Sequence, residues 1–288
     1  MNAQSTLVTA ALLTALAVPA WGQTAEPSKG SAHGAASIPN LTGSWNHPAF
    51  PWFEPPASGP GPITNRSRWP QMPQTMGGSA AVPPTKEGVS NYDRLVGDYT
   101  NPILRPWAAE VVKKFGEISQ KGITYPNPSN QCWPEPMPFI YKQFLVLLIQ
   151  KPDEVLLYYN GNGDIRHVRL NQPHRTPLTP AWYGDSVGHY EGDTLVIDTI
   201  GMNDRTFVDN YRTPHTEKLH VVERWKMIEG GTAMEASFTV DDPNTFYEPW
   251  SGVRRYRRVK QEMLEEVCAE NNTQLFDYHI PIADKPDF

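Results

Sequence analysis

The feature that most constrains the fold is a series of short strand patterns in the second half of the chain. The expected strands are 144–150, 155–159, 165–170, 186–190, 194–200, 219–228, 233–240 and 253–259. Turn sequences rich in Gly, Asn, Asp or Pro lie at 151–154, 160–163, 191–193 and 229–232. Strands joined by tight turns predict a mainly β fold, an antiparallel meander, and closing it into a barrel removes exposed edges. A β-sandwich of the same strands is the alternative.

The start of the ordered chain has a motif of its own. Gly43-Ser44-Trp45 resembles the start of lipocalin-like (calycin) barrels, in which Gly-x-Trp opens the first strand and the Trp plugs one end. The resemblance implies that the predicted barrel is lipocalin-like and that Trp45 is structural.

Other segments are expected to pack around this barrel in a single domain, residues 40–288. Residues 48–87 are rich in Pro and Gly, which block helices and central strands, so we expect an N-terminal wrapping segment. Two short helices are expected at 106–121 and 260–271. The first has an apolar stripe of Trp107, Val111, Val112, Phe115 and Ile118.

The N-terminus is typical of an exported protein. Residues 1–22 contain an apolar stretch of signal-peptide length and end in Ala20-Trp21-Gly22, which predicts cleavage before Gln23. Residues 23–39 are expected to form a flexible leader, and no later segment has the length and apolar character of a membrane span. We therefore expect a periplasmic or secreted protein, in which Cys132 and Cys268 form a disulfide bond.

The charge pattern excludes one class of partner. The net charge is −6, with acidic and basic residues intermixed, so a nucleic-acid-binding surface is not expected. The basic run at 254–258 is interpreted mainly as a solvated edge, because alternation splits it across both faces of a strand.

The densest group of polar residues lies in 182–193. It contains Gly184-Asp185-Ser186-Val187-Gly188, which matches the Gly-x-Ser-x-Gly motif of a hydrolase nucleophile elbow. That elbow requires a strand before the serine and a helix after it, whereas here a Pro-containing segment precedes it and a hairpin follows. A serine hydrolase is therefore the less favoured interpretation.

The histidines do not form a recognisable metal motif. None of the eight is in a His-x-His or His-Glu-x-x-His pattern, so no cofactor and no metal ligand is predicted. The sequence leaves open a divalent metal held by histidines from separate strands, for example His167, His189 and His215.

Strand alternation predicts candidate catalytic residues inside the barrel. Glu223 shares a face with Val221 and Trp225, and Asp198 shares one with Val196 and Ile200. His167 and Arg169 lie on one face of their strand. We expect these four charged side chains to point inward, as an acid/base site or as a structural ion-pair network.

Polar loops beside the strand ends supply further candidates. Asp185 and His189 are expected to form a carboxylate–imidazole pair that moves a proton. Arg169 is expected to bind substrate, and the loops add the remaining predicted substrate-binding residues, His174, Trp182, Tyr183 and His215.

Two longer motifs resemble a known family. Trp-Tyr-Gly-Asp-Ser-Val-Gly-His-Tyr-Glu-Gly-Asp-Thr-Leu-Val-Ile-Asp-Thr at 182–199 and Pro-His-Thr-Glu-Lys-Leu-His-Val-Val-Glu-Arg at 214–224 resemble an uncharacterised family of exported bacterial proteins. The resemblance extends from about Asn101 to Asp242. It implies a bacterial, periplasmic setting and supplies no reaction.

These observations predict a periplasmic enzyme performing cofactor-independent acid/base chemistry on a small, partly apolar molecule. The expected reaction classes are lyase, dehydratase, isomerase and hydrolase. The alternative is a non-catalytic, lipocalin-like carrier of a hydrophobic small molecule, since the same barrel serves both functions. The sequence makes no prediction of the oligomeric state.

Overall fold

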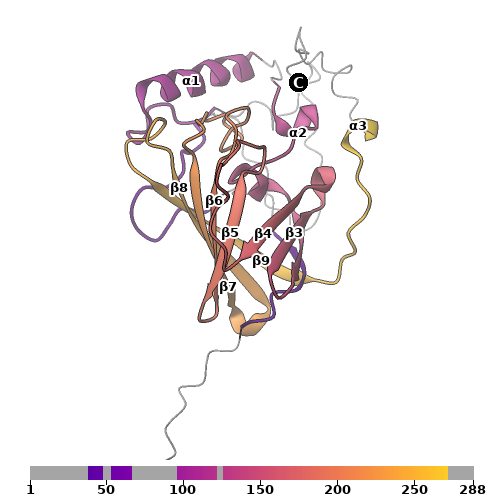
Figure 1. Ribbon diagram of the computed structural model, residues 1–288. Coiled ribbons are helices and arrows are strands. Elements are labelled where there is room, and N and C mark those ends of the chain that lie inside the picture. Colours follow the sequence, from indigo (N-terminus) through magenta and orange to yellow (C-terminus); the bar gives the residue numbers. More distant parts are fainter. Residues whose placement is uncertain (1–37, 48–52, 67–95, 122–125, 272–288) are drawn as a thin grey trace, which may run out of the picture. The chain divides into compact units, whose positions relative to one another are not determined.

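The computed structural model describes residues 38–47, 53–66, 96–121 and 126–271, which belong to one compact unit, residues 36–288. Nine strands of these residues form a closed barrel in chain order, and the last strand pairs with the first (Figure 1). They are β1 (Gly43–Asn46), β2 (Leu145–Gln150), β3 (Glu154–Tyr159), β4 (Ile165–Leu170), β5 (Asp185–Glu191), β6 (Thr194–Ile200), β7 (His220–Ile228), β8 (Ala233–Asp241) and β9 (Trp250–Val259). The predicted mainly β, lipocalin-like barrel is confirmed.

One neighbouring pair departs from the predicted meander. β4 and β5 run parallel, with Val168 opposite Ser186, whereas the other neighbouring strands are antiparallel. A parallel partner requires the chain to return to the end of the barrel at which the first strand began. Residues 171–184 make this return, and His174 in their middle contacts outward-facing side chains of β5 and β6. We call residues 171–184 the crossing.

The interior of the barrel is filled with large side chains. Trp45 is fully buried, its indole N–H donates to the Leu41 carbonyl at 2.9 Å, and the Arg258 guanidinium lies 4.4 Å from its ring centroid. Trp225 is also fully buried and stacks on Tyr256, with ring centroids 5.4 Å apart. Burial of side chains of this size is the main favourable term in folding the barrel.

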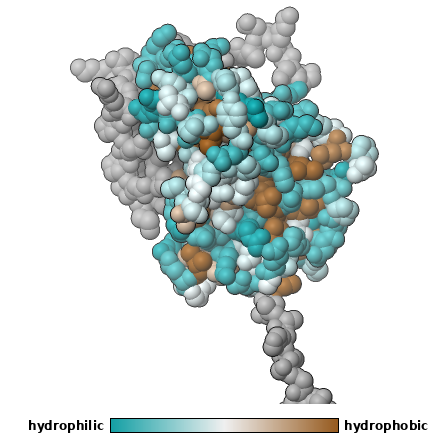
Figure 2. All heavy atoms as spheres, turned by 90° about the vertical axis from the view of Figure 1, so that its left-hand side faces the viewer, coloured by the Kyte–Doolittle hydropathy of each residue, from teal (hydrophilic) through white to brown (hydrophobic). Residues whose placement is uncertain are grey.

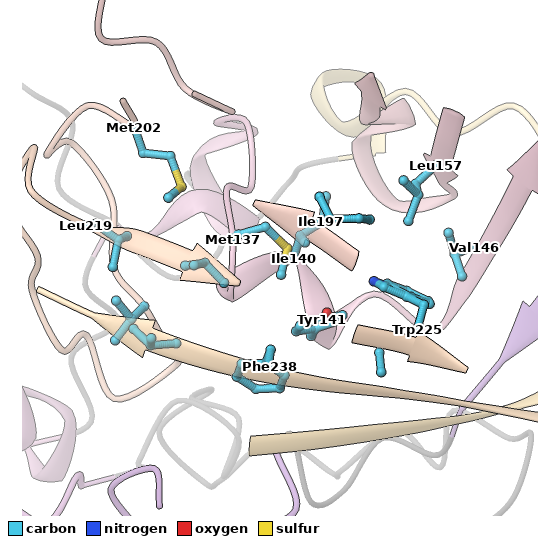
Figure 3. Close-up of a cluster of buried hydrophobic side chains, with 14 of the residues drawn as sticks. Met137, Ile140, Tyr141, Val146, Leu157, Ile197, Met202, Leu219, Trp225 and Phe238 are labelled. Atoms are coloured by element: carbon cyan, nitrogen blue, oxygen red, sulfur yellow. The ribbon is translucent and has the colours of Figure 1, made fainter. Parts of the chain in front are cut away.

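Residues that precede β2 pack against this interior. The 3-10 helix η2 (Phe139–Lys142) places Tyr141 4.8 Å from Phe238 and 6.0 Å from Trp225, measured between ring centroids. Figure 3 shows Met137, Ile140 and Tyr141 among the same buried side chains. One end of the barrel is therefore closed by a segment that is not itself a strand.

The helix α1 (Pro106–Gln120) buries Val112 of the predicted apolar stripe completely, but its other fully buried residues lie outside the stripe. Its buried residues are Ala108, Val112, Gly116 and Ser119, while Trp107 is 43% exposed. A Cβ on Gly116 would lie 2.7 Å from Val96, so only a glycine permits this close approach. Small residues therefore mark the packed face, and sequence hydrophobicity alone could not identify it.

The predicted helix at 260–271 is largely wrong. Residues 260–267 are irregular, and only α3 (Cys268–Asn271) is helical. The confirmed disulfide bond between Cys132 and Cys268 explains the difference, because it holds Cys268 at the opposite end of the barrel from the end of β9 (Figure 1). Eight extended residues span about 26 Å, whereas the same residues in a helix span about 12 Å.

The described part of the wrapping segment lies along β9. Glu54 pairs with Val253 through two backbone hydrogen bonds of 2.9 Å, and Phe53 packs 5.2 Å from Phe238 between ring centroids. The predicted signal peptide at 1–22, most of the predicted leader and residues 48–52 and 67–95 lie outside the described residues.

Figure 2 shows one face on which hydrophobic residues form separate patches within a mostly hydrophilic surface. Among the described residues, no helix has both the length and the apolar character needed to cross a membrane.

Candidate functional site

Glu223 lies inside the barrel, as its position in the strand pattern predicted. Its carboxylate is completely buried and accepts hydrogen bonds from the Tyr141 hydroxyl at 2.7 Å and the Trp225 indole N–H at 3.0 Å. Arg166 Nη2 donates to Glu223 Oε2 at 2.6 Å. We call Tyr141, Arg166, Glu223 and Trp225 the inner cluster. A buried ion pair such as this is costly to break but is weak support for stability or function by itself.

The cation beside Glu223 is Arg166, and the predicted inward orientation of His167 and Arg169 is wrong. Both point out of the barrel, and the side chain of His167 is 65% exposed and contacts Glu154 at 3.2 Å. Residues 165–169 carry one apolar residue on each face of β4, so the alternation did not distinguish the inward face from the outward one.

Asp198 also points outward, contrary to the prediction. Residues 194–197 of β6 are all buried, on both faces of the strand, so its apolar run carries no alternation that identifies the core side. The side chain of Asp198 is 39% exposed and lies among two histidines, His174 and His220.

Outside the barrel, the crossing brings together four of the predicted site residues and one that was not predicted. Arg169 Nη2 lies 2.9 Å from both carboxylate oxygens of Asp185, and His174 Nδ1 lies 3.0 Å from Asp185 Oδ2. The other ring nitrogen of His174 lies 3.0 Å from Asp198, which His220 Nε2 also contacts at 3.0 Å. We call this group the outer cluster: Arg169, His174, Asp185, Asp198 and His220.

The outer cluster stabilises the charged forms of its two carboxylates, Asp185 and Asp198. Burial acts to raise the pKa of Asp185, but hydrogen bonds from the Arg175 backbone, His174 and Arg169 outweigh it and lower the pKa. The pKa of Asp198 is lowered in the same way against its burial, and the hydrogen bond to Asp198 raises the pKa of His220. Both nitrogens of His174 are engaged by carboxylates, so the ring fastens the crossing to the barrel wall and is poorly placed to exchange a proton with a substrate.

The predicted Asp185–His189 pair is not formed. The two residues are four apart on one strand, which separates them by about 13 Å. His189 instead lies 3.1 Å from Glu191 and is half exposed. His215 is buried, 3.1 Å from the Thr206 hydroxyl, and its burial lowers its pKa.

Ser186 is not at a nucleophile elbow. It lies within β5, and its hydroxyl is 2.8 Å from the Thr199 hydroxyl and 3.5 Å from Arg166 Nη2. The chain continues into a hairpin, so the helix N-terminus that would assist a serine nucleophile is replaced by a strand.

The histidines considered for a metal also lie apart. His167, His189 and His215 contact Glu154, Glu191 and Thr206 respectively. Within residues 38–47, 53–66, 96–121 and 126–271, no group of three His, Cys, Asp or Glu side chains is arranged to hold a metal ion.

A second pair of carboxylates lies at the end of the barrel where the turn before β4 meets the end of the crossing. Asp164 Oδ2 accepts a hydrogen bond from the Glu135 backbone N–H at 3.1 Å, and the Tyr183 hydroxyl donates to Asp164 Oδ1. The Glu135 carboxylate is fully buried, 2.9 Å from Lys142 Nζ. We call Glu135, Lys142, Asp164 and Tyr183 the mouth cluster.

The two carboxylates of the mouth cluster have different electrostatic surroundings. Burial raises the pKa of Asp164 to about 6, although the Tyr183 hydrogen bond opposes the change, and the nearby Glu135 raises it further. Glu135 has a cation in direct contact, while Asp164 accepts from a neutral hydroxyl and a backbone N–H. Asp164 is therefore the carboxyl group that can both release and accept a proton near neutral pH.

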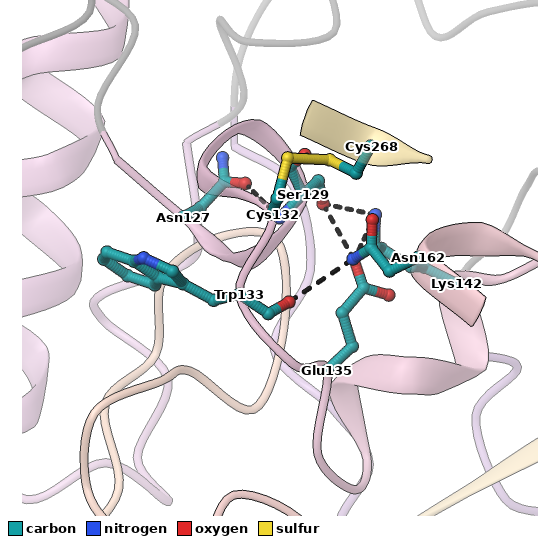
Figure 4. The surroundings of a disulfide bond; sticks show 8 residues. All are labelled: Asn127, Ser129, Cys132, Trp133, Glu135, Lys142, Asn162 and Cys268. Carbon is teal, nitrogen blue, oxygen red and sulfur yellow. Dashed lines mark hydrogen bonds and ion pairs between the residues drawn. A yellow bond between two sulfur atoms is a disulfide. The ribbon is translucent and has the colours of Figure 1, made fainter. Parts of the chain in front are cut away.

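Aromatic side chains border the mouth cluster. Trp133 and Trp182 lie with ring centroids 6.5 Å apart, and the Arg205 guanidinium lies 6.0 Å from the Trp182 ring centroid. Figure 4 shows that Trp133 and Glu135 belong to the same segment as Cys132, which the disulfide bond joins to Cys268. The covalent link thus holds the segment that supplies half of the mouth cluster.

Gly184 forms the turn by which Tyr183 joins the mouth cluster while Asp185 joins the outer cluster. It has a φ of +64°, and a Cβ there would lie 2.3 Å from the Ile200 carbonyl oxygen, so only glycine fits. The turn sends Tyr183 toward Asp164 and places Asp185 on the outer face of the barrel.

Asp209 is a second carboxyl group with a raised pKa, and its hydrogen-bond partners differ in kind from those of Asp164. Burial also raises the pKa of Asp209 to about 6. However, Asp209 accepts its hydrogen bonds from the Thr213 and Tyr211 backbones and the Thr213 hydroxyl, all within its own turn. Asp209 is therefore a structural residue of a loop, whereas Asp164 joins three separate segments of the chain.

Sequence reasoning missed most of the mouth cluster. Trp182 and Tyr183 were predicted to contact a ligand, but Asp164 lies between the predicted turn at 160–163 and the predicted strand at 165–170 and was given no role. Its position two residues before Arg166, on the same face of the strand, is the signal that could have identified it. Glu135 lies between two prolines, where no periodicity indicates its surroundings.

Comparisons with models of protein families, with characterised proteins and with solved structures find no match to this chain.

Proposed function

We propose that this protein is an exported enzyme that performs cofactor-independent acid/base chemistry on a small, partly apolar molecule at the mouth cluster. The observation that carries the proposal is the arrangement of Asp164, a buried carboxyl group with a pKa of about 6 and, among the described residues, no cation in direct contact. A general acid or base works best when its pKa lies near the operating pH.

Each neighbour of Asp164 has a role in this proposal. The Tyr183 hydroxyl positions the carboxyl group, and burial keeps the Tyr183 pKa above its usual value, so the hydroxyl remains a donor. Lys142 Nζ lies 2.9 Å from the Glu135 carboxylate and compensates its charge. Trp133 and Trp182 provide an apolar surface for the rest of the molecule.

The reaction classes that fit are lyase, dehydratase and isomerase, because each needs a proton to be removed and returned. A hydrolase that uses Ser186 as its nucleophile is disfavoured by the position of Ser186 inside β5. The carrier function is less well supported, because Trp45, Trp225 and Tyr141 occupy the barrel interior that a lipocalin-like carrier keeps for its ligand. The disulfide bond supports export.

The test is proton exchange in deuterated water, followed by NMR, on a panel of small ketones, hydroxy acids and unsaturated acids. Compounds that the wild type converts or deuterates should lose this reaction in Asp164→Asn by about 10²–10⁴-fold in rate. The wild-type rate should change with pH around 6. Asp193→Asn is the control, because Asp193 is exposed and contacts Lys226 on the surface. An Asp164→Asn variant with the wild-type rate would show that the proposal is wrong.

A further inference from the structure

His174 is the residue of 171–180 that is partly buried, whereas the other residues of that range are exposed. Both of its ring nitrogens lie 3.0 Å from a carboxylate oxygen, Nδ1 from Asp185 Oδ2 and Nε2 from Asp198 Oδ1. Asp185 belongs to β5 and Asp198 to the neighbouring strand β6. A single imidazole ring therefore ties the crossing to two strands of the barrel.

The doubly protonated form of the His174 ring is the one that fits both contacts. A charged carboxylate can only accept hydrogen bonds, and a neutral imidazole has one N–H and a lone pair on its other nitrogen. In the neutral ring, that lone pair faces a carboxylate oxygen at 3.0 Å, so repulsion replaces one of the two hydrogen bonds. The imidazolium form donates to both carboxylates. The crossing is therefore fully attached only while His174 carries its additional proton.

The charged groups around His174 keep both carboxylates charged. Burial acts to raise the pKa of Asp185 and of Asp198, but hydrogen bonds outweigh it and lower both pKa values. When the pH rises, His174 is therefore the member of these two contacts that changes its charge. The groups of this site are Arg169 of β4, Asp185 of β5, Asp198 of β6, His220 of β7 and Arg175 of the crossing, with Asp241 of β8 beyond His220.

His220, the second histidine of the outer cluster, is bound differently. Its Nε2 atom lies 3.0 Å from both oxygens of the same carboxylate, Asp198, so one N–H satisfies the contact. The hydrogen bond to Asp198 raises the pKa of His220. His220 also belongs to β7, which pairs directly with β6, so its contact does not hold the crossing. The two histidines thus share one carboxylate but differ in what they fasten.

The crossing has few other attachments on the β6 side. Backbone hydrogen bonds of 2.7 Å at Asn171 and 3.0 Å at Ala181 fix its two ends. Between these ends, side chains of β4 and β5 bind the first part of the crossing. Among the described residues, the polar contact of 172–180 with β6 is that of His174 with Asp198. Loss of a contact at His174 therefore leaves the middle of the crossing weakly held.

The crossing covers an apolar side chain of the outer wall. Val187 of β5 points outward, and its cross-strand neighbours are Arg169 and Asp198. Both neighbours contact the crossing, Arg169 through Gln172 at 3.0 Å and Asp198 through His174 at 3.0 Å. Val187 accordingly lies beneath the crossing and is only partly exposed. Separation of the crossing from the wall exposes this apolar surface to water.

We propose that His174 is a proton-dependent latch, a side chain that holds the crossing against the barrel wall while it is protonated. Loss of the proton breaks one of the two carboxylate contacts and loosens residues 172–180 above Val187. Histidine side chains change their charge between about pH 5 and pH 8. The crossing is therefore closed in mildly acidic surroundings and loosened in mildly alkaline ones.

The latch goes beyond the proposed function and is independent of it. Ala181 lies between His174 and Tyr183 in the chain, and two backbone hydrogen bonds of 3.0 Å and 2.9 Å fix it. The hydrogen bond from Tyr183 to Asp164 is therefore expected to survive the loosening of the crossing. Proton exchange at the mouth cluster and movement of the crossing can each be present or absent without the other.

Hydrogen exchange of the full, oxidised protein tests the latch. Mass spectrometry measures the protection of peptides that cover 172–181, after correction for the intrinsic dependence of amide exchange on pH. Between about pH 5.5 and about pH 8.5, this protection should fall about 3- to 10-fold, the effect of losing one hydrogen bond in a partly exposed site. Equal protection at the two pH values would overturn the proposal.

Two variants assign the effect to His174. His174→Gln has no titrating group, so its peptides should show the weak protection of the alkaline wild type at both pH values. His189→Gln is the matched control, because His189 is half exposed on the same outer wall and contacts Glu191, so this variant should keep the wild-type fall. A pH-dependent fall that persists in His174→Gln would overturn the latch, and so would full protection of His174→Gln at both pH values.

Discussion

Asp164 in the mouth cluster and Asp185 in the outer cluster are equally inaccessible to solvent, and their pKa values change in opposite directions. Asp164 is 6% exposed and Asp185 is 3% exposed. Asp164 contacts a tyrosine hydroxyl and a backbone N–H, and its pKa is raised to about 6. Asp185 contacts two arginines and a histidine, and its pKa is lowered. Burial acts to raise the pKa of both carboxylates, and the hydrogen bonds and cations around Asp185 outweigh it, whereas the partners of Asp164 do not.

The largest expected effect comes from removing the charge of Glu223, which leaves Arg166 buried without its counter-ion. Glu223→Gln should lower the free energy of unfolding by about 3–5 kcal/mol. Asp198→Asn, in the half-exposed part of the outer cluster, should lower it by less than about 1 kcal/mol. Urea denaturation of both variants measures the difference. Similar losses in the two variants would contradict the distinction between the inside and the outside of the barrel.

The pH dependence of the free energy of unfolding should distinguish Asp164 from Asp185. The pKa of Asp164 is higher in the folded chain than in the unfolded one, so its contribution to stability falls as pH rises from about 4 to about 6. The pKa of Asp185 is lower in the folded chain, so its contribution is present above about pH 4 and is lost as pH falls. The two groups should therefore give stability–pH slopes of opposite sign.

Variants isolate these slopes. Asp164→Asn should raise the free energy of unfolding at pH 7 by about 1–3 kcal/mol, because it removes a carboxylate that is costly to ionise. Asp185→Asn should lower stability at pH 7 and have a smaller effect at pH 3. Thermal unfolding at several pH values measures both differences. A destabilised Asp164→Asn variant at pH 7 would show that the Asp164 carboxylate is held charged, as that of Asp185 is.

The smallest expected effect concerns the histidines on the outer wall. His167→Ala and His189→Ala should each change the free energy of unfolding by less than about 0.5 kcal/mol, because both side chains are more than half exposed. Any reaction found for the wild type should proceed at the wild-type rate in both variants. A large loss of activity in either would restore its predicted catalytic role.

The barrel could be predicted from the sequence because the turns between its strands consist of recognisable Gly, Asn and Asp residues. Asn-Gly-Asn-Gly at 160–163 and Glu-Gly-Asp at 191–193 end one strand and start the next, and the predicted bounds of β4 match the structure. The parallel pairing of β4 and β5 could not be predicted, because no sequence pattern in residues 171–184 indicates at which end of the barrel they lead into β5.

The candidate site was harder to predict, for a different physical reason. Inward and outward faces are distinguished by hydrophobicity, and this works in β7, where Val221, Glu223 and Trp225 share the inward face. It fails in β4, where residues 165–169 carry one apolar residue on each face, and in β6, where residues 194–197 are buried on both faces. Glu135 lies between two prolines, where alternation gives no information, and Asp164 directly precedes β4, so that only its spacing from Arg166 indicates the face on which it lies.

The crossing has a consequence for engineering. The residues of 171–184 that bond to the barrel through backbone-to-backbone hydrogen bonds are Asn171 and Ala181, so the segment around them can be exchanged while each strand keeps its partner and its register. Residues 171–184 nevertheless deliver Trp182 and Tyr183 to the mouth cluster. In the proposed function, substrate preference can therefore be varied by exchanging one continuous segment, as antibody loops are exchanged on a constant framework, provided that Gly184 is kept as its last residue.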